Sequence, residues 1–264
     1  MEIIMDYLDK FYNAINEEER LLSKHGQVEY LTTMKYIKKY LEGISNPSIL
    51  EVGAGTGRYS VTLAKQGLHV TAVELVEHNL EILKSKLDGS EPIVALQGNA
   101  LDLSAFANNT FDLTMLLGPL YHLYTKEDKI KALSEAVRVT KPGGYIFVAY
   151  CMNEPTVIQY VFGMNQLREV MDGMLLTDDW HCKSDPKEIF DLVRTEDIAE
   201  LDAAVPVKRI KLVATDGASH YQRENIDAMD DETFGKWMDY HFAICERQDL
   251  IGASNHTLDI LQKD

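Results

Sequence analysis

The feature that most constrains the fold is a short apolar run followed at once by three glycines at every second position. Residues 49–52, Ile-Leu-Glu-Val, lack the alternation of a half-buried strand and predict a strand buried on both faces. Gly53, Gly55 and Gly57 then lead into a helical pattern at 59–64. Such a turn can bring backbone N–H groups close to a ligand, because no Cβ stands in the way. The sequence therefore predicts a ligand-binding turn after the first strand.

The spacing of these glycines narrows the class of ligand. The pattern is G-x-G-x-G, which differs from the G-x-G-x-x-G of dinucleotide folds, and position 58 is Arg. No Gly-Lys-Ser or Gly-Lys-Thr follows, so the turn is not a P-loop. Glu51, at the end of the strand, can accept a hydrogen bond from a loop amide or from a ligand amine. Taken alone, the pattern also fits a tight structural turn.

Strands and helices alternate after the chain break at Asn46-Pro47. This alternation predicts an α/β fold in which crossover helices connect parallel strands. A helix between the last two expected strands could support a parallel crossover or an antiparallel return, and periodicity does not decide between them. The expected strands after the first are 69–73, 93–97, 111–117, 145–150, 207–214 and 256–261, and the expected helices are 28–41, 59–64, 76–87, 126–140 and 230–247.

The chain is expected to form a single domain over residues 1–264. Residues 1–45 form a helical N-terminal cap, and residues 46–150 form the core that binds the ligand. Residues 151–206 hold helical pieces without a clear strand, so we expect a lid inserted over the carboxyl ends of the strands. Residues 207–264 complete the sheet.

Composition excludes several classes of partner. The net charge is −16, and residues 151–264 carry 23 acidic against 11 basic residues. No basic stripe is present to neutralise phosphates, which argues against nucleic acid and anionic membranes. No apolar stretch approaches the roughly 20 residues of a membrane span, and the first residues lack the pattern of a signal peptide. Three scattered cysteines indicate reduced thiols in a cytoplasmic protein, and Trp180-His181-Cys182 lacks the paired spacing of a metal site, so no metal is expected.

Further candidate contacts follow the second and third strands, at the edge of an open parallel sheet where ligands bind. Glu74 is the first acid after the second strand, placed to accept both hydroxyls of a ribose; the alternative is an exposed loop acid. Asn99 and Ala100 follow the third strand. The Asn99 side-chain oxygen could accept from an adenine amino group, with Leu75 and Leu101 on the two faces of the ring.

The stretch that follows the fourth strand makes a resemblance specific. It reads Gly-Pro-Leu-Tyr-His-Leu over 118–123, and Lys-Pro-Gly-Gly precedes the fifth strand at 141–144. Together with the glycine turn and Glu74, these stretches resemble small bacterial class I S-adenosylmethionine-dependent methyltransferases over most of residues 10–150. The insertion matches poorly, and Asn99 stands where that family most often has Asp. The resemblance implies a Rossmann-like sheet of seven mostly parallel strands with helices on both faces and an antiparallel last strand.

The resemblance also implies S-adenosyl-L-methionine as the cofactor, with a role for each turn. Glu51 would orient the cofactor's ammonium group, Glu74 would bind its ribose, and Leu75 would lie against its adenine. The methionine part would be lined by Gly53, Ala54, Gly55 and Gly57 together with the backbone of Leu117 and Gly118, and the adenine would be bound by Asn99 and Ala100.

The expected reaction is methyl transfer to an oxygen, nitrogen or sulfur atom of a small molecule. A sulfonium methyl is already activated, so the protein must place the acceptor in line with it and remove a proton where the acceptor carries one. His122 is the candidate base, although it could instead cap a helix or hold a loop. Tyr121 could line the acceptor pocket or merely pack. Candidates for the pocket roof are Tyr7, Tyr12, Arg20, Thr33, Trp180 and His181.

Two other functions fit parts of the pattern. An NAD(P)-dependent oxidoreductase would share the nucleotide-binding fold, but the glycine spacing differs and no Tyr-x-x-x-Lys pair is present. A non-catalytic protein could keep the cofactor site and methylate nothing. The identity of the acceptor cannot be predicted, because the insertion carries no motif.

Overall fold

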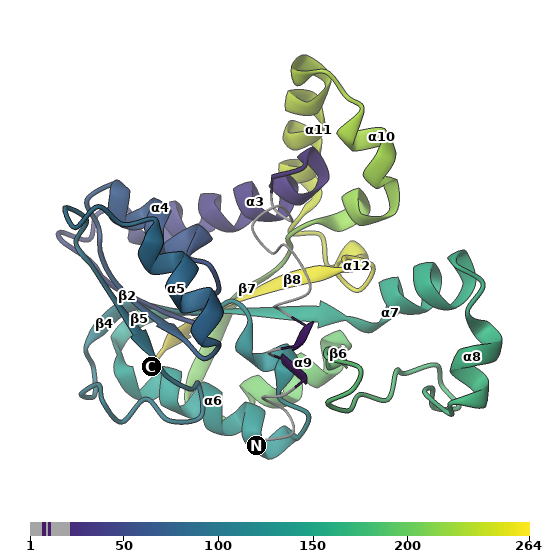
Figure 1. The fold of residues 1–264 in the computed structure, drawn as a ribbon, viewed down its shortest axis with the longest axis horizontal. Helices are drawn as coiled ribbons and strands as arrows, with labels where there is room; N and C mark the ends of the chain where they lie inside the picture. The colour runs from purple at the N-terminus through teal and green to yellow at the C-terminus, as the bar shows by residue number, and fades with distance from the viewer. Residues whose placement is uncertain (1–6, 9, 12–21) are drawn as a thin grey trace.

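The computed structural model describes residues 7–8, 10–11 and 22–264, and its centre is one mixed β-sheet (Figure 1). The strand order along the sheet is β3-β2-β1-β4-β5-β8-β7. Strands β1 to β5 are parallel, whereas β8 is antiparallel to both of its neighbours, β5 and β7. The bounds are β1 (Ser48–Val52), β2 (His69–Glu74), β3 (Ile93–Gln97), β4 (Phe111–Leu116), β5 (Thr140–Met152), β7 (Val207–Ala214) and β8 (His256–Lys263).

Helices cover both faces of this sheet, because its central strands are apolar on both sides. In β1, Leu50 packs into a core cluster that includes residues of α6 (Lys126–Val139) and α9 (Thr195–Asp202). Its neighbour Ile49 points to the opposite face, where the cluster includes residues of α3 (Lys24–Leu41) and α4 (Arg58–Lys65). Figure 1 shows α3 and α4 above the sheet and α6 below it. The expected α/β fold with helices on both faces is confirmed.

Several helices begin where the sequence supplies a capping side chain. The Ser23 hydroxyl accepts a hydrogen bond from the Gly26 N–H at the start of α3, and Thr125 does the same for Asp128 at the start of α6. Asp230 caps α11 (Asp231–Ile244) in the same way. The other helical segments are α5 (Glu77–Ser85), η1 (Pro119–His122), α7 (Asn153–Thr156), η2 (Val157–Gly163), α8 (Leu167–Asp172), η3 (Gly217–Gln222), α10 (Arg223–Asp227) and α12 (Gln248–Ile251).

The structure departs from the expectations around the fifth strand and the insertion. Strand β5 already begins at Thr140, so residues 141–144, expected as a turn, belong to it. The insertion contains β6 (Leu192–Val193), which pairs in parallel with the end of β5 and makes the sheet eight-stranded. A two-residue strand is too short to show an alternating pattern, so the sequence did not predict it. Beyond β5, helices α7 and α8 extend away from the sheet in Figure 1.

Among the described helices, none is both long enough and apolar enough to cross a membrane.

The third glycine of the turn has a packing role. Gly57 immediately precedes α4 and has a φ of +85°, a conformation that side chains with a Cβ rarely adopt. A Cβ there would lie 2.6 Å from Leu83 Cγ and 2.9 Å from Val61 Cγ2. Glycine at this position therefore lets the start of α4 approach α5.

We expect Gly57→Ala to destabilise the fold by about 1–3 kcal/mol, because it combines an unfavourable φ with a steric overlap. The matched control is Gly235→Ala in the interior of α11, where a Cβ would meet nothing within 4 Å. There the same substitution should stabilise the helix by about 0.5–1 kcal/mol. Urea denaturation of both variants measures the two effects, and equal changes would contradict the packing role of Gly57.

Candidate active site

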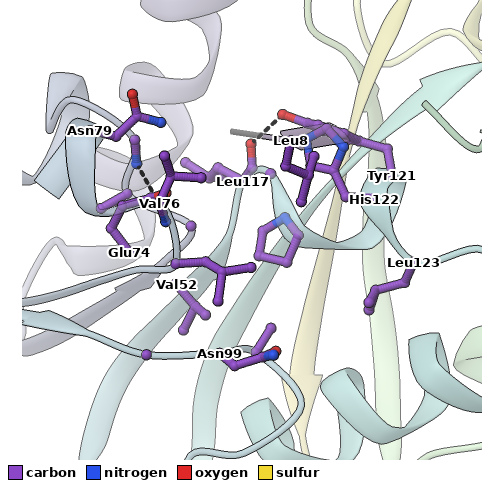
Figure 2. A pocket seen from close by; sticks show the side chains of 18 of the residues that line it. Leu8, Val52, Glu74, Val76, Asn79, Asn99, Leu117, Tyr121, His122 and Leu123 are labelled. Atoms are coloured by element: carbon purple, nitrogen blue, oxygen red, sulfur yellow. Dashed lines mark hydrogen bonds between the residues drawn. The ribbon is translucent and has the colours of Figure 1, made fainter. Parts of the chain in front are cut away.

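A cavity of about 500 Å³ opens at the carboxyl ends of the first four strands (Figure 2). Its volume lies in the range of pockets that bind small molecules or cofactors, roughly 300–1,000 Å³. The sequence-predicted residues that line it are Glu51, Gly53, Ala54, Gly55, Glu74, Leu75, Asn99, Ala100, Leu117, Gly118, Tyr121 and His122. Gly57 is not among the described lining residues. The structure thus brings together turns from four separate strands.

The carboxylate of Glu74 joins the glycine turn to the end of β2. It accepts hydrogen bonds from the Gly55 N–H at 2.7 Å and from the Val76 N–H at 2.9 Å. Glu74 is buried, and burial raises the pKa of its carboxyl, while these N–H groups act in the opposite direction. The two turns that define the expected cofactor site are therefore in direct contact.

The glycine turn uses its own N–H groups within the protein. The N–H groups of Gly53 and Ala54 both donate to the Val73 carbonyl, at 2.8 and 3.0 Å, and that of Gly57 donates to Ala54 at 2.9 Å. These N–H groups, like that of Gly55, therefore already have acceptors within the protein. What the turn offers to the cavity is a surface without side chains. A Cβ on Gly53 would meet Pro119 Cδ at 2.7 Å, so this glycine also lets the loop after β4 pack against the turn.

Glu51 lies at the base of the cavity and is almost fully buried, with 1% of its surface exposed. Burial raises the pKa of its carboxyl to about 8, and the hydrogen bond from the Ser60 hydroxyl opposes this rise. At neutral pH the carboxyl is therefore largely protonated. A cationic group placed beside it would favour the ionised form.

Asn99 and the residues around it form the wall below the turns. The Asn99 side-chain oxygen accepts a hydrogen bond from the Leu101 N–H at 2.9 Å, so it is already engaged in shaping its loop. Leu75, Ala100 and Leu101 add apolar surface to the same part of the cavity. The side chain of Asn79 also lines the cavity and hydrogen-bonds to Glu74.

The opposite end of the cavity is aromatic. The Tyr121 hydroxyl donates to the Leu117 carbonyl at 3.1 Å (Figure 2). The rings of Tyr121 and His122 both pack against Phe190, with centroid distances of 5.7 and 5.5 Å, and Phe11 meets Phe190 from the N-terminal segment at 5.6 Å. Tyr121 and His122 line this end of the cavity, and the ring contacts through Phe190 to Phe11 join three distant parts of the chain beside it.

His122 is held in one tautomer by the insertion. Its Nδ1 lies 2.9 Å from the Ile189 carbonyl oxygen, which can only accept, so Nδ1 carries the proton and Nε2 carries the lone pair. Burial lowers the pKa of the imidazole to about 4, which the hydrogen bond to Ile189 opposes. The ring is therefore neutral at pH 7. It is the last residue of η1, and Thr125 rather than His122 caps α6.

The insertion reaches the cavity through residues 186–190, which the sequence analysis did not single out. Pro186 lines the cavity, and Phe190 packs against two residues that line it, Tyr121 and His122. Ile189 has a φ of +67°, unusual for a β-branched residue, and its carbonyl also accepts from the Tyr124 hydroxyl at 2.7 Å. The sequence analysis missed these residues because an apolar pair such as Ile189-Phe190 looks the same whether it lies beside a pocket or in the hydrophobic core.

The expected roof is mostly different from the observed one. Trp180 is 44% exposed and packs against Phe162, and His181 Nε2 lies 3.0 Å from the Leu192 carbonyl. Like Tyr7 and the buried Thr33, they are absent from the described residues that line the cavity. Tyr12 and Arg20 lie outside the described residues. From the N-terminal segment, Leu8 lines the cavity.

The fold and the cavity are similar to those of one class of protein, the methyltransferases. Residues 50–148 match the family model described as "Methyltransferase domain". Over this region the chain is similar to methyltransferases, and its fold is that of solved S-adenosylmethionine-dependent methyltransferases, as the resemblance implied.

Individual relatives agree with this class. The ubiquinone biosynthesis O-methyltransferase of Methylocella silvestris is 26% identical over 69% of this chain and 68% of its own. The demethylmenaquinone methyltransferase of Clavibacter sepedonicus is 32% identical over 42% of this chain and 44% of its own. A solved S-adenosylmethionine-dependent methyltransferase from Thermotoga maritima has the same fold, with a TM-score of 0.56, 17% identity and coverage of 99% of this chain and 100% of its own. The chain spans half or less of the length of several curated relatives that it matches.

The raised pKa of Glu51 predicts a pH-dependent stability. The unfolded chain loses the Glu51 proton near the ordinary pKa of 4.5, whereas the folded protein keeps it up to about pH 8. Between these values the folded state binds the extra proton, so rising pH destabilises it. Glu51→Gln removes this contribution, and we expect the stability of the variant relative to the wild type to increase from pH 5 to pH 8. Urea denaturation at each pH measures the difference.

The control is Glu77→Gln, since Glu77 is an exposed acid on α5. Its stability relative to the wild type should not follow this trend. A Glu51→Gln difference that is independent of pH would show that the carboxyl is ionised in the folded protein.

Proposed function

We propose that this protein transfers the methyl group of S-adenosyl-L-methionine to a small-molecule acceptor bound at the aromatic end of the cavity. One observation carries the proposal: Glu74 and the glycine turn meet through a 2.7 Å hydrogen bond at the wall of a cavity of about 500 Å³. The family match over residues 50–148 supports the same activity. The names of two relatives, which act in ubiquinone and menaquinone synthesis, support a small-molecule acceptor.

The chemistry of the lining residues fits the parts of this cofactor. Glu74 offers its carboxylate to the ribose hydroxyls, which would share its oxygens with the N–H groups of Gly55 and Val76 and with the side chain of Asn79. Leu75 and Leu101 offer apolar surface to the adenine. Glu51 lies where it would accept from the methionine ammonium, and binding that cation would release the Glu51 proton.

The adenine amino group has less support from Asn99 than the resemblance implies. The Asn99 oxygen already accepts from the Leu101 N–H, so the amide would have to serve both partners. Ala100 adds a small apolar contact at the same place. We therefore assign adenine binding to the whole loop after β3, residues 98–101, which would bind the ring mainly through complementary shape.

When bound, the cofactor supplies a sulfonium methyl that needs no further activation. The chain's own part is to hold the acceptor in line, exclude water and receive the acceptor's proton. Leu117 and Gly118 shape the methionine end, and Tyr121, whose ring packs on Phe190, supplies a wall against which an acceptor packs. His122 receives the proton on Nε2, because its Nδ1–H is committed to the Ile189 carbonyl.

The alternative functions are separated by different observations. An oxidoreductase that uses NAD(P) lacks support from the family match and from the glycine spacing. A non-catalytic cofactor-binding protein would share every contact described for the cofactor, so only an assay of methyl transfer separates it from the enzyme. The absence of a basic stripe argues against nucleic acid as the acceptor.

Binding of S-adenosylhomocysteine, measured by isothermal titration, tests the cofactor site. We expect Glu74→Ala to weaken binding by about 1–3 kcal/mol, because the ribose hydroxyls and the Gly55 N–H lose their acceptor. The matched control, Glu77→Ala, removes an exposed acid three residues away and should bind as the wild type does. Wild-type affinity in a folded Glu74→Ala variant would place the ribose elsewhere.

Two substitutions of His122 separate a base from a structural tether. Asn can still donate to the Ile189 carbonyl, whereas Ala cannot, and neither can accept a proton. If His122 is the base, both variants lower kcat about 10²–10⁴-fold with the cofactor affinity retained. If His122→Asn keeps its activity and His122→Ala loses it, His122 serves only to hold the Ile189 carbonyl and is not the base.

The pH profile gives an independent measure of the same residue. An imidazole with a pKa of about 4 stays neutral, and able to accept a proton, down to mildly acid pH. We therefore expect kcat at saturating cofactor to show no loss centred near pH 6.5, the ordinary pKa of histidine. A half-maximal rate near pH 6.5 that disappears in His122→Asn would contradict the lowered pKa.

A further inference from the structure

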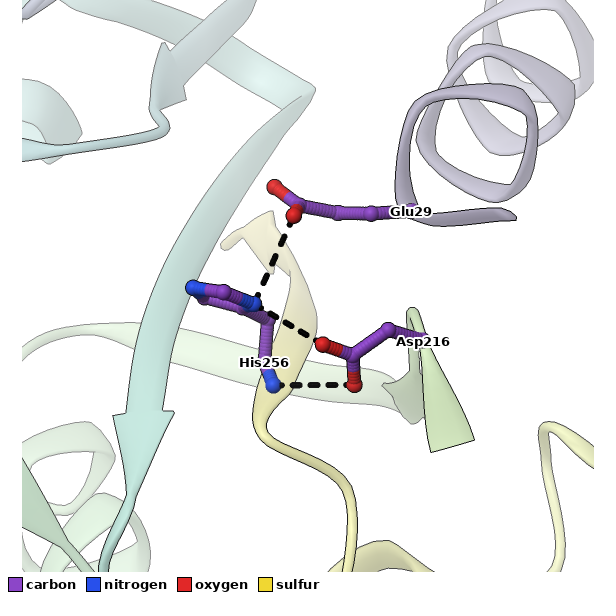
Figure 3. A group of neighbouring side chains, drawn as sticks. All are labelled: Glu29, Asp216 and His256. Carbon is purple, nitrogen blue, oxygen red and sulfur yellow. Dashed lines mark hydrogen bonds and ion pairs between the residues drawn. The ribbon is translucent and has the colours of Figure 1, made fainter. Parts of the chain in front are cut away.

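A second group of polar side chains lies outside the cavity, at the junction of three segments far apart in the sequence (Figure 3). Glu29 comes from α3, Asp216 follows β7, and His256 begins β8. One potential ligand atom from each residue lies within 4.8 Å of the other two. None of the three belongs to the described lining of the cofactor cavity.

Both carboxylates converge on the same ring nitrogen. His256 Nδ1 lies 2.9 Å from Asp216 Oδ2 and 3.4 Å from Glu29 Oε2, and Figure 3 shows the two acids approaching it from different elements. The side chains are 21%, 8% and 15% exposed for His256, Asp216 and Glu29, so solvent reaches the group only partly. Two acids beside one nitrogen favour a cation there, which is either a proton or a metal ion, and the side-chain nitrogen of Asn255 lies 3.0 Å from the same atom.

The second oxygen of Asp216 is held by the protein. Asp216 Oδ1 accepts from the Ser254 hydroxyl at 2.7 Å and from the His256 N–H at 3.1 Å. These contacts orient the carboxylate so that Oδ2 faces the imidazole. The pKa of the Asp216 carboxyl falls to about 2: burial alone would raise it, but the hydrogen bonds and charge of His256 outweigh burial. The acid therefore stays ionised at all ordinary pH values.

The spacing of the three atoms suits a small divalent ion. Ligand atoms of a tetrahedral site with bonds of about 2.1 Å lie roughly 3.4 Å apart. The separation from His256 Nδ1 to Glu29 already has this value, and the separation to Asp216 would need to open by about 0.5 Å, a shift within reach of side-chain rotation. One imidazole nitrogen with two carboxylate oxygens favours zinc or a similar transition-metal ion over magnesium, which prefers oxygen ligands alone.

We propose that Glu29, Asp216 and His256 bind one divalent transition-metal ion, of which Zn²⁺ is the representative, and that this ion fastens α3 to the β7–β8 edge of the sheet. With a neutral imidazole the three ligands carry two negative charges, which match the charge of the ion. Because the ligands meet only in the folded chain, binding stabilises the fold. The sequence analysis expected no metal, since the three residues share no local spacing.

A proton competes with the metal for the imidazole. Burial lowers the pKa of His256, but Glu29, the neighbouring Cys151 of β5 and Asp216 outweigh it and hold the pKa well above 6.5. His220 of η3 also interacts with this group.

Isothermal titration of the chelator-treated wild-type protein with ZnCl₂ tests the proposal. We expect one equivalent to bind. Thermal unfolding should shift upward by several degrees when zinc is added. MgCl₂ at the same concentration should produce neither effect. Absence of stoichiometric zinc binding by the folded wild type would overturn the proposal.

Variants locate the ion. Glu29→Gln and His256→Asn should each weaken zinc binding at least tenfold and remove the thermal shift. The control is His181→Asn, because His181 lies 3.7 Å from the Asp197 carboxylate in a different part of the chain and is not one of the three proposed ligands. Unchanged zinc binding in folded Glu29→Gln and His256→Asn would place the ion elsewhere and overturn the assignment. If either variant fails to fold, circular dichroism shows it, and the stoichiometry of zinc binding and the zinc-induced thermal shift of the wild type decide.

Discussion

One buried carboxylate determines how the cavity is assembled. Glu74 accepts N–H groups from both the glycine turn and the start of the loop that leads to α5, so the ends of β1 and β2 are fixed relative to each other. Pro119 then packs against Gly53, at a distance that leaves no room for a Cβ. The loops after β1, β2 and β4 are thus held against one another, and the cavity lies between them. A buried carboxylate is costly unless it accepts hydrogen bonds. The N–H groups of Gly55 and Val76 supply them, so the same contacts stabilise the fold and shape the cavity.

The parts of the fold that local pattern controls were predicted well. The seven longer strands lie close to their expected positions, because runs of buried apolar residues bounded by Gly, Pro and Asn specify a strand without reference to the rest of the chain. The antiparallel return of β8 could not be derived in this way, since a helix such as α11 permits either direction. The resemblance supplied it, and the pairing of β8 with β5 and β7 confirms it.

The parts that depend on contacts between distant segments were missed. The amides of Gly53 and Ala54 donate to the end of β2, a pairing that no motif encodes. Gly57 serves helix packing, since only the fold shows Leu83 beside it. Phe190, from an insertion without periodicity, packs against two residues that line the cavity. Each of these residues has its role because of contacts with residues far away in the sequence. Local sequence patterns do not predict such contacts.

The left-handed backbone at Ile189 links the insertion to the reactive end of the cavity. Its carbonyl binds both His122 and Tyr124, while the ring of the next residue, Phe190, packs against that of His122. One peptide unit therefore sets the tautomer of the imidazole and the shape of the space in front of it. Changes in insertion length or composition that rotate this unit would alter proton acceptance and acceptor fit together, so selection for a new acceptor has a single point on which to act without disturbing the cofactor's half of the site.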